Sequence, residues 1–318
     1  AKARALVGRV GVVGLDDPVA ASLARKSKAK RTVGFRGGGG PAGGKGGGAG
    51  EKTDTPRTNK KKSPPPPSTP PGGGGGGAPP PGTVRRVVLT SSIAAIAHGH
   101  RTEAVRTEAD WTVVERSPAY QKSKTLAERA AWDFAAEHPE GPELTVVNPG
   151  MVLGPALSTA TSTSHEPVRM LLGRQVPGSP RVGWATVDVR DLAVAHRLAM
   201  ETPEAAGKRY ICAGEHLWMR DLGRLLAEEF GPRGFRVPTR QLPDLLVRAI
   251  AVVDKTVRLT VPSLGQVERL SAERAERELG WTMRPVRDSV RDTAESLLRL
   301  GVVPMPAGAR PLAEPAHT

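Results

Sequence analysis

The stretch that decides how this chain is interpreted starts at residue 118 and reads Pro118-Ala-Tyr120-Gln-Lys-Ser-Lys124-Thr-Leu-Ala-Glu-Arg-Ala-Ala-Trp-Asp-Phe134. After Pro118, apolar residues recur at three- and four-residue spacing, which is typical of an amphipathic helix. Tyr120 and Lys124 are four residues apart, so they lie on one side of that helix, one turn from each other. The ammonium group is expected to lower the pKa of Tyr120 from about 10. The pattern indicates a proton donor to a carbonyl oxygen, although Tyr-x-x-x-Lys also occurs on ordinary surface helices.

Short β-branched runs lie on both sides of this helix. Residues 83–90 and 143–148 are typical of buried parallel strands. A strand, a helix and a strand at this spacing predict a right-handed parallel crossover. The first strand stops at Ser91 and Ser92, and ligand-binding residues commonly follow the carboxyl end of such a strand. A hydroxyl there could donate a hydrogen bond to a substrate oxygen, or it could serve only the local backbone.

The alternation of strands and helices continues downstream. Residues 181–188 are predicted to form a strand that leads into a helix capped by Asp191. Another strand is predicted at 208–214, and helices at about 218–230, 242–256, 271–279 and 287–300. His98 and His100 flank a glycine, but without a third ligand they predict no metal site. These patterns together predict an α/β fold.

The first 83 residues have a different composition from the rest. They contain 21 of the 37 glycines and 12 of the 30 prolines, so they cannot bury enough apolar surface to offset chain entropy. They also carry 15 Lys/Arg against 4 Asp/Glu, which accounts for +11 of the net charge of +14. We expect residues 31–82 to be a disordered, basic Gly/Pro-rich linker. A basic arm can bind nucleic acid, but here glycine dilutes the charges, so a solvated linker is favoured.

Residues 1–30 contain one pattern with two interpretations. Gly8, Gly11 and Gly14 follow a short apolar run at three-residue spacing and precede a helix-like stretch. Glycines in this arrangement let a backbone approach a pyrophosphate at a helix N-terminus. Asp16 and Asp17 would repel a phosphate, so accidental spacing is an equal alternative.

The cysteine content and the hydropathy pattern indicate the compartment. Cys212 is the single cysteine, which excludes an intramolecular disulfide and suggests a reducing environment. No apolar run approaches membrane-spanning length, and no secretory signal pattern opens the chain. We therefore expect a cytoplasmic protein with neither a membrane nor a nucleic-acid partner.

Five segments in order resemble the extended short-chain dehydrogenase/reductase superfamily, the NAD-dependent epimerase/dehydratase family. They are residues 87–92, 120–128, 147–150, 187–193 and 209–212. Asp110-Trp111 and residues 130–134 resemble the dihydroflavonol reductase and aldehyde reductase branch. The resemblance covers about 83–302. It implies a Rossmann-like parallel sheet, a smaller substrate-binding region at about 154–185 and 215–302, and a flexible tail at 303–318.

The resemblance also implies a reaction, namely reduction of a small aldehyde or ketone by hydride transfer from NADPH or NADH. Tyr120 would be the acid, and Lys124 would orient the nicotinamide ribose and tune the tyrosine. Ser92 would position the substrate oxygen, with Ser91 as the second choice. Pairing into a homodimer through the helix that bears Tyr120 is a further implication. The nicotinamide ring would lie beside the segment Pro149, Gly150, Met151 and Val152. The phosphates of the cofactor would be contacted by Gly8, Gly11 and Gly14.

The N-terminal half departs from the family pattern. Val7 stands where the family has a threonine before its first glycine, and residues 15–82 contain no convincing second, third or fourth strand pattern. The missing units would select between NAD and NADP. They would also supply a strand between the glycine strand and the one that starts near Val84, so an open apolar edge is predicted there. Two alternatives follow: a catalytically silent scaffold that has lost cofactor binding, and a sugar-nucleotide epimerase or dehydratase.

Overall fold

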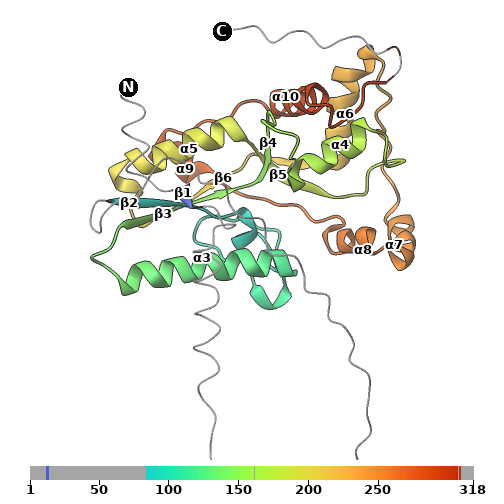
Figure 1. The fold of residues 1–318 in the computed structure, drawn as a ribbon. Coiled ribbons are helices and arrows are strands. Elements are labelled where there is room, and N and C mark those ends of the chain that lie inside the picture. Colours follow the sequence, from blue (N-terminus) through green and yellow to red (C-terminus); the bar gives the residue numbers. More distant parts are fainter. Residues whose placement is uncertain (1–11, 14–83, 161, 307, 309–318) are drawn as a thin grey trace, which may run out of the picture.

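The computed structural model describes residues 12–13, 84–160, 162–306 and 308, in which helices pack on both faces of a parallel sheet (Figure 1). The strands are β1 (Val12–Val13), β2 (Arg86–Thr90), β3 (Glu143–Pro149), β4 (Met151–Leu153), β5 (Gly183–Asp188), β6 (Arg209–Cys212) and β7 (His216–Trp218). The α-helices are α3 (Ala119–Glu137), α4 (Glu166–Leu172), α5 (Val189–Glu201), α6 (Met219–Phe230), α7 (Asp244–Val253), α8 (Lys255–Thr260), α9 (Glu273–Leu279) and α10 (Val286–Arg299). Among the described helices, not one combines the length and apolar character that a membrane span requires.

The main sheet is parallel and has the strand order β1-β2-β3-β6. β2 and β3 are in register from Arg86 opposite Glu143 to Thr90 opposite Val147. Helix α3 connects these two strands and covers one face of the sheet, while α5 and α9 cover the other (Figure 1). The α/β fold and the crossover built around the helix at 119–137 are therefore confirmed.

Strand β1 corrects the prediction that an apolar edge stands open beside β2. Val12 and Val13 pair directly with Val88 and Leu89, so in the described part of the chain no strand lies between β1 and β2. The backbone groups on this edge of β2 need hydrogen-bond partners, and two β-branched residues supply them without an intervening strand. The rest of the predicted first unit (1–30) and the linker (31–82) lie outside the described residues.

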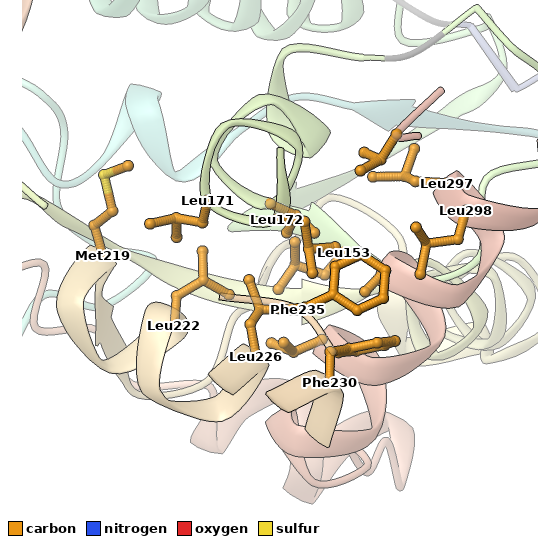
Figure 2. Packing of buried hydrophobic residues seen from close by; sticks show 14 of the residues in the cluster. Leu153, Leu171, Leu172, Met219, Leu222, Leu226, Phe230, Phe235, Leu297 and Leu298 are labelled. Atoms are coloured by element: carbon orange, nitrogen blue, oxygen red, sulfur yellow. The ribbon is translucent and has the colours of Figure 1, made fainter. Parts of the chain in front are cut away.

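A second sheet and helices α4, α6, α7, α8 and α10 form the C-terminal region. β4 is parallel to β5, and β5 is antiparallel to β7. Leucines and phenylalanines of α4, α6 and α10 pack with Leu153 in one buried cluster (Figure 2). The sequence analysis did not predict β4, α4 and β7. Val303, assigned to the tail, is 1% exposed in this cluster, so the packed body extends past 302.

Two helix boundaries also differ from prediction. The helix expected at 242–256 is two helices that divide at Asp254, which accepts a hydrogen bond from Val257 N. The N-cap of α5 is Asp188 rather than Asp191, because β5 runs straight into the helix and Asp188 Oδ1 accepts from Arg190 N at 2.9 Å. Asp191 instead binds Arg284, whose Nη2 lies 2.8 Å from Asp191 Oδ1.

One buried carboxylate fixes α3 to the sheet. Glu128 is fully buried, and its Oε1 accepts a hydrogen bond from Arg209 Nε of β6 at 2.6 Å. Its Oε2 accepts from Ser91 Oγ, directly after β2, and from Asn148 Nδ2 of β3 at 2.8 Å. A single side chain of α3 thus binds groups on three neighbouring strands. Burying a charge is costly unless it is paired and hydrogen-bonded, and here both conditions are met.

The arginine of this pair extends the network to the loop before α3. Arg209 Nη1 donates to the carbonyl oxygens of Glu108 and Asp110, each at 2.9 Å. Its guanidinium also lies 3.8 Å from the centroid of the Trp111 ring. The loop that leads into the Tyr120 helix is therefore held by the same ion pair that holds the helix.

Replacing Glu128 with Gln should lower the free energy of unfolding by about 3–5 kcal/mol, because it leaves the Arg209 guanidinium buried without its counter-charge. Urea unfolding measures the loss. Glu137→Gln at the exposed end of α3 is the matched control and should change little. A change of less than about 1 kcal/mol in Glu128→Gln would show that the pair does not anchor the helix.

Candidate active site

The topology brings the start of α3 to the carboxyl edge of the sheet. β2 ends at Thr90, and the chain continues through the 3-10 turn η1 (Ile93–Ala95) and a loop before α3 begins at Ala119. Because α3 then returns to the start of β3, its first turn lies at the edge where the parallel strands end. Helix α3 also contacts η1 directly. The segment that follows β2 and the helix that carries Tyr120 are therefore neighbours in the fold, and the joint site of Ser92 and Tyr120 stays a prediction.

Tyr120 and Lys124 form a pair on the first turns of α3. The ammonium nitrogen of Lys124 lies 5.8 Å from the centroid of the Tyr120 ring. Tyr120 is 58% exposed, which is unusual for a large aromatic side chain and leaves it accessible to a ligand. The proximity predicted from the four-residue spacing is confirmed, whereas the roles of the two residues stay predictions.

The two adjacent serines have different environments. Ser91 is 3% exposed, and its hydroxyl is used by Glu128. Ser92 is half-buried, and its Oγ accepts a hydrogen bond from Ala94 N at 3.1 Å, which caps η1. Accepting this bond leaves the Ser92 hydroxyl proton available to a ligand. The local backbone role of the serine is therefore observed for Ser92, whereas its contact with a substrate oxygen stays a prediction.

The segment predicted to lie beside the nicotinamide joins the two sheets. Pro149 ends β3, Gly150 makes the turn, and the half-buried Met151 and Val152 start β4. A side chain at Gly150 would meet the carbonyl oxygen of Ala185 at 2.3 Å, so only glycine fits there. Close contact of the turn with β5 fixes this segment at the carboxyl edge.

Other predicted positions stand apart from this group. Gly8, Gly11 and Gly14 lie outside the described residues, and only Val12 and Val13 between them are described, as β1. Among residues 84–160 and 162–306, no group of three His, Cys, Asp or Glu side chains could hold a metal ion. Cys212 is fully buried, and burial raises the pKa of its thiol, which is the environment of a core residue.

A buried acid–imidazole pair was missed by the sequence interpretation. Glu268 Oε2 accepts from Ala185 N at 2.7 Å, and its Oε1 lies 3.5 Å from His98 Nε2. Burial, reinforced by the neighbouring His100, lowers the pKa of His98 to about 4. Burial raises the pKa of Glu268 to about 7, against the effect of the Ala185 hydrogen bond. No motif surrounds Glu268 in the sequence, and only the fold brings it to His98.

This pair makes opposite contributions to stability as pH changes. The folded pKa of His98 lies below its ordinary value of 6.5, so its contribution is lost as pH falls from 6.5 toward 4. The folded pKa of Glu268 lies above its ordinary value of 4.5, so its contribution is lost as pH rises from 4.5 through 7. In the wild type, the two opposite pH dependences of the free energy of unfolding therefore largely cancel between pH 4.5 and 6.5.

Glu268→Gln should therefore make the free energy of unfolding fall by about 1–3 kcal/mol more than in the wild type when pH is lowered from about 7 to about 5. Urea unfolding at several pH values measures this slope. The mirror-image control, His98→Gln, should instead lose stability as pH rises over that range. If the free energy of unfolding changed with pH in the same way in Glu268→Gln and in the wild type, the opposite pKa shifts assigned to Glu268 and His98 would be contradicted.

Comparison with known proteins supports the sequence resemblance. No family model matches the chain. Cinnamoyl-CoA reductase CAD2 of Medicago truncatula is 34% identical over 224 residues, which are 68% of this chain and 61% of that protein. Ketoreductase AzaE of Aspergillus niger is 30% identical over 230 residues, covering 68% and 63%. The chain thus spans about three fifths of the length of the curated relatives it matches.

Solved structures agree with this relationship. Yeast methylglyoxal/isovaleraldehyde reductase Gre2, solved with NADPH, matches with a TM-score of 0.54 and 27% identity over 69% of this chain and 65% of that one. The structure of gox2253 matches with a TM-score of 0.57 at 24% identity, which supports the fold alone. The described residues form a Rossmann-like fold, in which Val12 and Val13 are all that is described of the N-terminal half. With its Tyr120-x-x-x-Lys124 helix and these relatives, the chain belongs to the extended short-chain dehydrogenase/reductase superfamily (NAD-dependent epimerase/dehydratase family), in its dihydroflavonol reductase-like branch.

Proposed function

We propose that this protein reduces an aldehyde or ketone with a nicotinamide cofactor, using Tyr120 as the proton donor. The observation that carries the proposal is the arrangement at the carboxyl edge of the sheet. An exposed tyrosine lies beside a lysine ammonium on the helix that contacts η1, and Ser92 caps η1 with its hydroxyl proton still unused. A proton donor and a second hydrogen-bond donor at one edge suit a carbonyl oxygen that gains negative charge.

The described residues fit a nicotinamide group at this edge. The Gly150 turn is held flush against β5, which leaves Met151 and Val152 half-buried where β4 begins. Asn148 Oδ1, at the end of β3, is a buried acceptor without a hydrogen-bond partner among the described residues. Residues that would hold the cofactor are Lys124 at its ribose and Pro149 to Val152 at its ring. When bound, the cofactor would supply the hydride.

The protein side of the reaction follows from these groups. The Tyr120 hydroxyl would donate its proton to the substrate oxygen as the carbonyl is reduced. The Lys124 ammonium would stabilise the phenolate left on Tyr120, because an adjacent positive charge favours the anionic form. Ser92 Oγ would hold the same oxygen with a hydrogen bond throughout. Ser91 and Glu128 act one step further away by fixing the helix that presents Tyr120.

The relatives support this class of reaction and the choice of NADPH. They include a ketoreductase, cinnamoyl-CoA reductases and an NADPH-dependent methylglyoxal reductase from Saccharomyces cerevisiae, which is 30% identical over 235 residues. Gre2 was solved with NADPH. Helix α3 also offers a surface for the homodimer implied by the resemblance, since Leu126 is 52% and Phe134 46% exposed on it.

Titration with NADPH and NADH, followed by nicotinamide fluorescence, tests the cofactor claim. We expect micromolar binding with a preference for NADPH, and we expect Gly11→Asp to weaken it, because a carboxylate at that position would repel the pyrophosphate. Absence of binding by either nucleotide at millimolar concentration would overturn the enzyme proposal and favour the catalytically silent scaffold.

Three substitutions test the assigned roles in a carbonyl-reduction assay. Tyr120→Phe keeps the ring beside Lys124 but removes the proton, so kcat should fall by about 10²–10⁴-fold with little change in nucleotide binding. Ser92→Ala should lower kcat by about 10²-fold. Its neighbour is the matched control. Ser91→Ala should reduce the free energy of unfolding by about 1–3 kcal/mol, since it removes a hydrogen bond to the buried Glu128, while leaving kcat within a few-fold. A large fall in kcat for Ser91→Ala together with a nearly unchanged kcat for Ser92→Ala would refute the role of Ser92 in holding the substrate oxygen.

A further inference from the structure

A cavity of about 570 Å³ opens between the end of α4 and the segment at 236–238. This volume lies within the range of small-molecule sites. The lining consists of Arg174, Gln175, Arg236 and two Val-Pro pairs at 176–177 and 237–238. None of the residues assigned to carbonyl reduction lines it. The cavity therefore needs an explanation of its own.

The lining carries positive charge without compensation. Arg174 and Arg236 are both exposed, and no carboxylate lines the cavity. Within the described part of the chain, neither guanidinium has a hydrogen-bond or ion-pair partner. Three arginines close to them in sequence are paired, namely Arg169 with Glu166, Arg181 with Asp244, and Arg233 with Glu295, whereas Arg240 shares the lack of a partner among the described residues but does not line the cavity. The two unpaired guanidinium groups thus line one concave surface.

The backbone of Arg174 supplies a second, independent observation. Its φ of 50° places it in the left-handed region, where it is the only non-glycine residue among those described. Two hydrogen bonds hold it there, Arg174 N to Leu171 O at 3.2 Å and Gln175 N to Met170 O at 2.9 Å, and they close the end of α4. Helices usually place glycine at this position because a side chain is disfavoured. Glycine stands one residue earlier, at Gly173, so an arginine is held in a conformation that a glycine would adopt without cost.

We propose that this cavity binds the phosphate group of a small molecule between the guanidinium groups of Arg174 and Arg236. Guanidinium forms paired, charge-assisted hydrogen bonds with phosphate oxygens, and two such groups match a dianion. The left-handed conformation at the end of α4 fixes the backbone of Arg174 at the cavity. The volume exceeds the needs of inorganic phosphate, so the ligand carries an organic or a second phosphoryl part next to its phosphate. The site lies within the region at about 154–185 and 215–302 that the family resemblance assigns to substrate binding, but no residue given a role in carbonyl reduction lines it, and phosphate binding there does not depend on that chemistry.

Isothermal titration with inorganic pyrophosphate at constant ionic strength, without nucleotide, tests the proposal. The first 83 residues carry 15 Lys/Arg, whose charge attracts anions unspecifically, so the readout is the difference between the wild type and variants of the full chain. The specific phase of the titration is the saturable binding of pyrophosphate to the cavity. Arg174→Gly and Arg236→Ala should each raise its dissociation constant at least ten-fold. Arg224→Ala, which removes an exposed arginine of α6 outside the cavity, is the matched control and should leave it unchanged.

Arg174→Gly also has a second readout that separates binding from folding. Since glycine adopts the left-handed conformation freely, this variant should unfold at an equal or higher urea concentration than the wild type while losing pyrophosphate binding. Arg174→Lys should keep part of the affinity, because it retains the charge but not the paired hydrogen bonds. Equal pyrophosphate affinity of Arg174→Gly and wild type would overturn the proposal, as would the absence of a specific phase in the wild type at millimolar pyrophosphate.

Discussion

The described fold depends on one buried ion pair, between Glu128 of α3 and Arg209 of β6. Two fully desolvated charges are tolerated only when each is neutralised and hydrogen-bonded, and this requirement specifies geometry more strictly than apolar contact does. The carboxylate must reach Ser91 and Asn148 at the same time, so the helix can take only one height and one rotation against the strands. The arginine in turn fixes the loop around Trp111 that leads into the helix.

This constraint explains why the two neighbouring serines differ. The Ser91 hydroxyl donates to the buried carboxylate, whereas the half-buried Ser92 caps η1, which contacts α3. Tyr120, eight residues before Glu128, lies on the same helix but beyond the packed part, where it stays exposed. Hydrogen bonding to an oxygen that gains negative charge requires accessible hydroxyl groups that a rigid structure holds in place.

The C-terminal region has a different physical basis. Its core is apolar, with α4, α6 and α10 packed around Leu153 (Figure 2). It meets the sheet where Gly150 presses against Ala185, and Glu268 and His98 bridge the two regions nearby. The unpaired Arg174 and Arg236 lie on this region and line a cavity to which Tyr120 does not contribute.

The sequence by itself determined the elements whose signals are local. Helical spacing at 119–137, β-branched runs at β2, β3 and β6, and the one-turn separation of Tyr120 and Lys124 all follow from residues close together in the chain. Tertiary structure alone decided that Glu128 meets Arg209 across 81 residues, that Ser92 rather than Ser91 is available, and that Val12 pairs with Val88. It also decided that Asp188 caps α5 and that Glu268 faces His98. Burial and long-range pairing set these outcomes, and neither leaves a periodic trace in the sequence.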